Sequence, residues 1–222
     1  MSEGRDIYHE PPQKVLLRTA DVYQTNVDNG VVGYSDTLLA IVANFKNNGI
    51  PEGANAQSMV GKSKRGEVAF RLFARIDSAT HLIEAAGFKT RGCLAMTGCA
   101  SAACAMIEGK SLEEALEITT EDIRKAVDGV PANKANTLTF AVEAIRALVG
   151  DFWVRQGVTL AELDQRVPCD TYSVACLMCE HCSLRDIRTD MLMAEWDDDA
   201  SVSACNDADK RLIEEIAVTG GE

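Results

Sequence analysis

The hydrophobic pattern of this chain changes from a strand period to a helical period at Gly92, and this change limits the folds open to it. In the stretch that leads up to Gly92 the residues alternate in character, with Arg71 and Arg75 on one face, so we expect strands there. The expected strands lie near residues 55–61, 67–76 and 80–90. After Gly92 the spacing becomes helical. Because these strands follow one another and the later helices come after them, rather than alternating with them, the sequence predicts an α+β fold.

Capping residues and glycines indicate where the helices begin and end. Ser35 is a candidate cap, Ser111 with Glu114 is typical of a capping box, and Thr119 with Asp122 indicates another helix start. Gly150 is expected to end a long amphipathic helix. The helices are expected at residues 34–47, 93–108, 133–149, 159–165 and 207–217, with short ones after Ser111 and Thr119.

The 222 residues suffice for one ordinary domain with an extension. We divide them into an N-terminal arm (1–33), a main domain (34–152) and a cysteine-rich, acidic extension (153–222). No apolar run approaches the roughly 18–20 residues that span a bilayer. The first residues hold no apolar signal core either. We therefore expect a cytoplasmic protein with no membrane partner.

Charge is distributed unevenly along the chain. The net charge of −12 argues against a nucleic acid bound mainly through its phosphates. Residues 190–222 hold ten acidic residues against two basic ones, whereas residues 61–92 hold seven basic against three acidic. Two interpretations stay open: both segments are solvated surfaces, or the acidic segment folds over the basic strands or docks on a basic partner.

Eight cysteines are present, three of them between Cys93 and Cys104. Without an export signal, metal binding or thiol chemistry is expected before disulfides. Cys93 opens a helix, where free amides stabilise an anion, and this favours metal ligation or nucleophilic sulfur chemistry. From Cys93 to Cys104 a helix rises about 16 Å. Cys99 and Cys104 are therefore expected as small core residues.

Four further cysteines lie close together in the extension. They are Cys169, Cys176, Cys179 and Cys182. The last three form a C-x2-C-x2-C run, which is typical of iron–sulfur sites. Four thiolates also suit tetrahedral zinc, so zinc is the alternative metal. A third interpretation is a helix in which the cysteines merely face the core. We expect these four residues to hold a metal, with an iron–sulfur cluster of undefined type ahead of zinc.

The central motifs resemble those of one known family. GFKTRGC (87–93) precedes a small-residue helix and then GKSLEEA (109–115). With the flanking segments, the resemblance covers roughly residues 34–150 and points to the NifU/IscU-type iron–sulfur cluster assembly scaffolds. It implies a sandwich with a three-stranded antiparallel sheet covered by helices. It also implies Cys93 as cluster ligand or persulfide acceptor, and a cysteine desulfurase and apo iron–sulfur acceptor proteins as partners.

The sequence departs from this family at its other usual ligands. Arg65 and Glu67 stand where the family has a cysteine and an aspartate in a loop. Asn136 and Thr137 lie where the family presents a further cysteine, often after histidine. Because a [2Fe–2S] cluster normally needs four ligands, the usual site cannot be assembled from these positions alone.

Several hypotheses follow. The leading one is a scaffold or carrier that accepts iron and sulfur and passes a cluster to acceptors, with no catalytic residues and no turnover of its own. The extension could also fold back and supply thiolates beside Cys93. The alternative is a non-assembling adaptor or subunit with a structural iron–sulfur or zinc site, and a third is a sulfur relay through Cys93 alone. A homodimer and membership of a larger complex both stay open.

Overall fold

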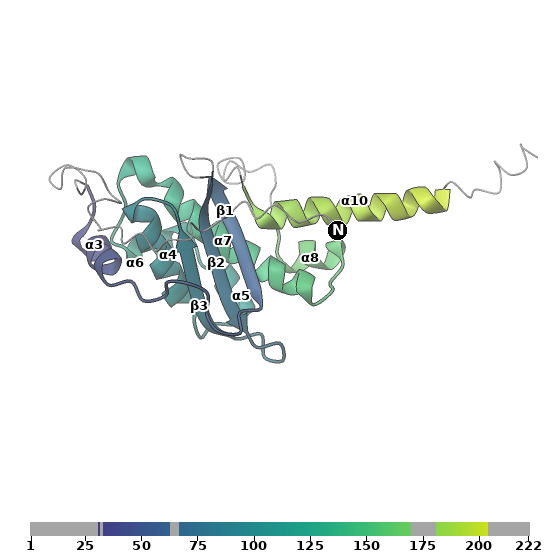
Figure 1. The fold of residues 1–222 in the computed structure, drawn as a ribbon, viewed down its shortest axis with the longest axis horizontal. Helices are drawn as coiled ribbons and strands as arrows, with labels where there is room; N and C mark the ends of the chain where they lie inside the picture. Colours follow the sequence, from purple (N-terminus) through teal and green to yellow (C-terminus); the bar gives the residue numbers. More distant parts are fainter. Residues whose placement is uncertain (1–30, 32, 63–66, 170–180, 204–222) are drawn as a thin grey trace, which may run out of the picture. The chain divides into compact units, whose positions relative to one another are not determined.

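The computed structural model describes residues 31, 33–62, 67–169 and 181–203, except the side chains of 197–203 (Figure 1). The chain divides into two units, residues 1–33 and 34–222. The N-terminal arm and the helix expected at 207–217 lie outside the described residues, apart from residues 31 and 33. The division of the remaining chain at residue 152 stays a prediction.

A three-stranded antiparallel sheet forms the centre of the second unit. Its strands are β1 (Ala56–Lys62), β2 (Val68–Ile76) and β3 (Ile83–Thr90), and β2 lies in the middle. Ser58 pairs with Leu72, and Leu72 in turn pairs with Phe88. All three strands lie close to the ranges that the alternating pattern predicts, because one face of the sheet is buried under helices.

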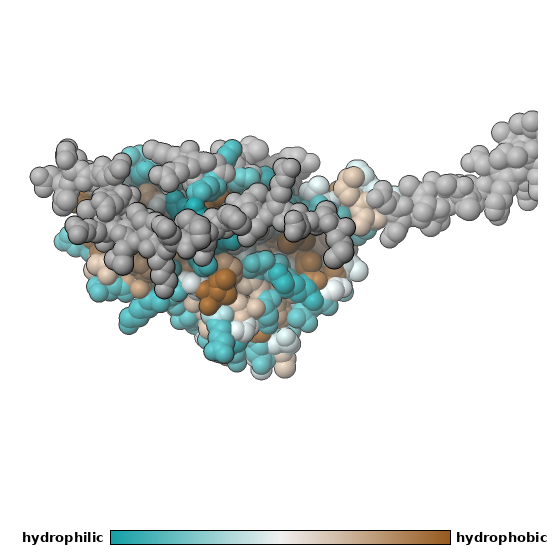
Figure 2. Space-filling view, in the orientation of Figure 1, coloured by the Kyte–Doolittle hydropathy of each residue, from teal (hydrophilic) through white to brown (hydrophobic). Residues whose placement is uncertain are grey.

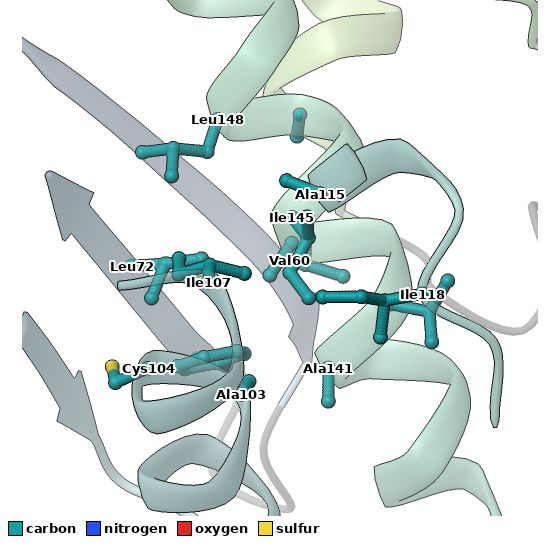
Figure 3. Packing of buried hydrophobic residues seen from close by; sticks show 14 of the residues in the cluster. Val60, Leu72, Ala103, Cys104, Ile107, Ala115, Ile118, Ala141, Ile145 and Leu148 are labelled. Carbon is teal, nitrogen blue, oxygen red and sulfur yellow. The ribbon is translucent and has the colours of Figure 1, made fainter. Parts of the chain in front are cut away.

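Two long helices cover that face. Helix α4 (Leu94–Ile107) contacts β3 and β2, and helix α7 (Asn136–Arg155) contacts β1 and β2. Figure 1 shows both helices behind the strands. Val60, Leu72, Ile107 and Ile145 meet in the core between the sheet and these helices (Figure 3). This arrangement confirms the predicted α+β sandwich.

The shorter helices begin where the capping residues predict. Helix α3 (Asp36–Ala43) is capped by Ser35, whose hydroxyl accepts from the Leu38 amide at 3.1 Å. Ser111 and Thr119 both make reciprocal capping boxes with an acidic side chain, at the starts of α5 (Leu112–Leu116) and α6 (Thr120–Ala126). A 3-10 turn, η1 (Ala132–Lys134), leads into α7.

Two expectations about the later helices are corrected. Gly150 does not end α7, which continues to Arg155. It lies inside the helix, and the position requires glycine because Leu184 packs so closely there that a Cβ would overlap the leucine side chain. Helix α8 (Leu160–Arg166) was expected, but α10 (Ser183–Ser203) was not.

None of the described helices is both long and apolar enough to cross a membrane.

Candidate functional site

Cys93 lies at the start of α4, at the turn that follows β3. It is the N-cap residue of α4, with extended backbone angles, and its carbonyl accepts from the Thr97 amide at 3.1 Å. Its thiol is partly exposed and forms no disulfide. The small residues of α4 bury that helix tightly against the sheet, so the position of Cys93 is fixed by the core.

Tyr34 contacts Cys93 from the segment before α3. The two side chains are hydrogen-bonded. Burial, and then the negative charge of the Cys93 thiolate, raise the pKa of Tyr34 to about 12. The tyrosine therefore stays neutral at physiological pH and keeps a hydroxyl hydrogen beside the sulfur. The sequence analysis did not single out Tyr34, although it immediately precedes the cap residue Ser35.

Cys99 and Thr137 join α4 to the beginning of α7 in the same region. The Cys99 sulfur lies 3.6 Å from the Thr137 hydroxyl, and that hydroxyl donates to the Lys134 carbonyl at 2.7 Å. Burial raises the pKa of Cys99 to about 11, so this thiol stays protonated at neutral pH. Cys99 and Cys104 are both fully buried, which confirms them as core residues.

Cys182 lies at the opposite edge of the sheet, against β1. It forms an antiparallel bridge with Val60, and the Gly61 amide donates to the His181 carbonyl at 2.8 Å. The Met59 amide donates to the Ser183 hydroxyl at 3.1 Å. Residues 181–183 therefore continue the sheet beyond β1 and hold Cys182 in a fixed place.

The Cys182 thiol is buried and lies at the beginning of α10. Burial raises its pKa, and the negative charges of Cys169 and Glu143 raise it further. The backbone amides of Leu184 and Arg185 donate to its sulfur and oppose this rise. Such amides are the groups that stabilise a sulfur anion at the start of a helix. Cys169 and Cys182 thus lie close enough to interact electrostatically.

Arg188 joins the two ends of the segment that carries the four cysteines. Its guanidinium is buried, donates to the Val167 carbonyl through Nη2, and has Nε 3.0 Å from Asp164 Oδ1. Val167 lies two residues before Cys169, and Cys182 lies six residues before Arg188. The contact thus brings the start of the segment next to its end, and sequence reasoning did not identify it.

The structure places the predicted site residues at two locations. Cys93 lies with Tyr34 at the start of α4, whereas Cys182 interacts with Cys169 at the β1 edge. Cys176, Cys179 and Arg65 lie outside the described residues. Among the residues that are described, no three His, Cys, Asp or Glu side chains form a group that could hold a metal ion. Of the four cysteines of the expected site, only Cys169 and Cys182 are described, so the set of ligands stays a prediction.

Comparison with known proteins identifies the protein family to which the chain belongs. The model of the NifU-like N terminal domain matches residues 33–159, and the chain belongs to this family. It is 31% identical to the iron-sulfur cluster assembly scaffold protein IscU 1 of Archaeoglobus fulgidus over 124 residues, which are 56% of this chain and 79% of that protein.

Two further relatives show how much of the chain the likeness covers. The nitrogen fixation protein NifU of Azotobacter chroococcum is 34% identical over 119 residues, which span 54% of this chain and only 38% of that protein. Among solved structures, a nitrogen-fixing NifU-like protein (N-terminal) from Brucella abortus aligns with a TM-score of 0.44 and 12% identity, over 55% of this chain and 94% of that one. The cysteine segment lies beyond the family match, which ends at residue 159.

Proposed function

We propose that this chain is an iron–sulfur cluster assembly scaffold or carrier, which accepts iron and sulfur and passes a cluster to acceptor proteins. The observation that carries the proposal is the position of Cys93, partly exposed at the N-cap of α4 within a domain of the NifU-like family. Its partners are a cysteine desulfurase, which supplies sulfur, and apo iron–sulfur proteins. The chain acts in the cytoplasm and turns over no substrate of its own.

The cluster is held by Cys169, Cys176, Cys179 and Cys182. Four thiolates complete the ligand set of a [2Fe–2S] or [4Fe–4S] cluster. The described pair fits this role, because Cys169 interacts with Cys182 and two backbone amides donate to the Cys182 sulfur. Hydrogen bonds to ligand sulfurs tune such clusters. Cys93 serves as a further ligand or as the persulfide acceptor, and zinc is the competing metal for the four thiolates.

A second function is favoured by Thr137. It lies at the start of α7, where the resemblance implies a cysteine ligand, and its hydroxyl contacts Cys99 and the Lys134 carbonyl instead. A hydroxyl engaged in this way offers no soft ligand to iron. The chain would then be a non-assembling adaptor or subunit, with a structural iron–sulfur or zinc site in its extension and no transfer of a cluster.

Anaerobic reconstitution with iron and sulfide tests these functions. For a scaffold we expect stoichiometric iron and acid-labile sulfide on the full chain, and transfer of the cluster to an apo-ferredoxin. Cys182→Ser should remove most of the bound iron, and Cys93→Ser should slow the gain of sulfur from a cysteine desulfurase. Cys104→Ala is the matched control, because Cys104 is buried in the core and should not affect loading.

The outcomes separate the functions. A bound cluster that never moves to the acceptor supports the adaptor, and a fixed zinc content without sulfide supports its zinc form. A chain that takes up neither iron nor sulfide under these conditions refutes the scaffold.

A further inference from the structure

Helix α10 exposes three large apolar side chains. Leu192, Met193 and Trp196 are 39%, 50% and 60% exposed. In Figure 2 the described part of α10 shows pale and tan atoms at the surface. A tryptophan that is more than half exposed leaves much apolar area in water, and contiguous exposed apolar groups mark interaction sites. We call these three residues the α10 ridge.

The α10 ridge is separate from the face with which α10 packs on the protein. That packed face contains Leu184, which lies against Gly150 of α7, and the buried Arg188. Met191 is also partly buried against the core. At about 100° per residue, the centre of the ridge lies roughly 120° around the helix from this packed face. The helix thus has a second apolar face, which does not contribute to its own anchoring.

From residue 189 onward the charged residues of α10 are all negative. Residues 189–203 contain five acidic residues and no basic one. Of these acids, Asp190 and Glu195 are exposed within the described part of the helix. A surface that binds the ridge must therefore bring positive groups to its rim, because like charges at an interface cost free energy.

Charge also argues against the two terminal segments of the chain as occupants, because both are net acidic. Residues 1–30 contain five acidic and three basic residues, and residues 204–222 contain five acidic and two basic ones. A second copy carries the same net charge of −12, which opposes its approach as a whole even though its residues 61–92 are net basic. Nucleic acids and anionic lipid surfaces are negative as well.

We propose that the α10 ridge docks into an apolar groove rimmed by lysine and arginine on a partner protein, with Trp196 as the central anchor. An amphipathic helix that presents residues at i, i+1 and i+4 suits the helix-in-groove mode of recognition. Tryptophan is enriched among the residues that dominate binding. The proposal rests on α10 alone and is independent of any metal in the cysteine segment.

Site-specific photocrosslinking of the full chain in its own cells tests the docking. Met193→benzoylphenylalanine places the reactive group on the ridge and leaves Trp196 intact. Ala194→benzoylphenylalanine is the matched control, since Ala194 is exposed but points away from the ridge on the helical wheel. We expect one dominant protein adduct from position 193 and at least five-fold less from position 194.

The adduct partner is then purified and its Kd for the full chain is measured. Trp196→Ala should weaken binding at least ten-fold, and Asp190→Lys with Glu195→Lys should weaken it and reduce its dependence on salt. Glu117→Lys, at the exposed acidic residue that caps the end of α5, is the charge control and should leave the Kd within two-fold. The proposal is overturned if position 193 gives no adduct, gives only a second copy of this chain, or gives the same adduct as position 194. Binding that Trp196→Ala leaves unchanged overturns it too.

Discussion

The Gly61 amide donates a hydrogen bond of 2.8 Å to the His181 carbonyl and so joins the edge of the sheet to the end of the cysteine segment. Cys182 follows directly and bridges Val60. An edge strand presents unpaired backbone groups that invite other strands. Residues 181–183 cover part of this edge, and the same contacts hold a thiol that the proposed cluster needs.

Gly61→Ala should destabilise the fold by about 2–4 kcal/mol. The φ of Gly61 is +74°, and a Cβ there would lie 2.7 Å from Phe140 Cε2. The loss thus has two parts, left-handed backbone strain and a clash with α7. Urea denaturation of the variant measures the change in the free energy of unfolding.

Gly109→Ala is the control for the backbone part. Its φ is +78°, but nothing lies within 4 Å of the Cβ position. We expect a loss of about 1–2 kcal/mol from this control. Equal losses at the two glycines would show that Phe140 does not restrict position 61.

Gly150→Ala should weaken the attachment of α10. Alanine in a helix interior normally gains about 1 kcal/mol over glycine. Here the added Cβ would overlap Leu184, and overpacking of this kind costs about 1–3 kcal/mol. We expect faster hydrogen exchange at the amides of α10, with little change in the sheet. In the double variant Gly150→Ala, Leu184→Ala, the free energy lost should be smaller than the sum of the losses in the two single variants, because the shorter side chain at position 184 removes the clash. A loss equal to that sum would contradict the predicted contact.

Arg188→Met should destabilise the extension by about 1–3 kcal/mol, since the Val167 carbonyl loses its donor. Arg188 Nε and Nη1 make no hydrogen bond within the described chain, so removal of this buried group offsets part of the cost. The substitution also removes the ion pair between Nε and Asp164, whose atoms lie 3.0 Å apart. If the cysteine segment binds metal, cobalt(II) titration followed by thiolate absorption should show at least ten-fold weaker binding, with Arg188→Lys in between.

The exposed pair Arg124–Glu121 provides the control for Arg188. Its side chains are 59% and 54% exposed, and such pairs contribute less than about 1 kcal/mol. Arg124→Met should therefore change neither stability nor cobalt binding measurably. A wild-type affinity in Arg188→Met would show that this arginine does not position the cysteines.

Alkaline pH should destabilise the domain through Cys99. Its pKa rises from 9.0 to about 11 on folding, because burial disfavours the thiolate. The unfolded chain then loses its proton first, so stability is complete below pH 9 and falls as the pH rises towards 11, by about 2–3 kcal/mol. Cys99→Ala should remove this component of the slope in denaturation measured between pH 8 and 11. An unchanged slope in Cys99→Ala would refute the effect.

The elements of the main domain were predictable because their signals are local. Alternation between residues 67 and 76 reflects a strand with one buried face. Ser111 and Thr119 satisfy amides only three positions away, so their boxes need no distant partner. The small residues after Cys93 likewise indicate a helix packed closely on other elements.

The errors arise where the partner of a residue is far away in sequence. Gly150 carries the usual signal for a helix end, yet Leu184 of α10 requires it as a contact surface inside α7. Helix α10 itself lacks a clear hydrophobic period, because its second half exposes the ridge rather than burying it.

The amino-acid sequence alone determined the fold class, the strand and capping positions, the family resemblance and the cysteines that are expected to bind metal. Those properties follow from short-range hydrogen bonding, side-chain alternation and the chemistry of sulfur. Only the tertiary structure decided that Cys93 meets Tyr34, that Cys182 is held on β1, and that α10 keeps an apolar face in solvent. These relationships depend on packing between segments up to 124 residues apart, as Met59 and Ser183 are, and no local pattern specifies such contacts.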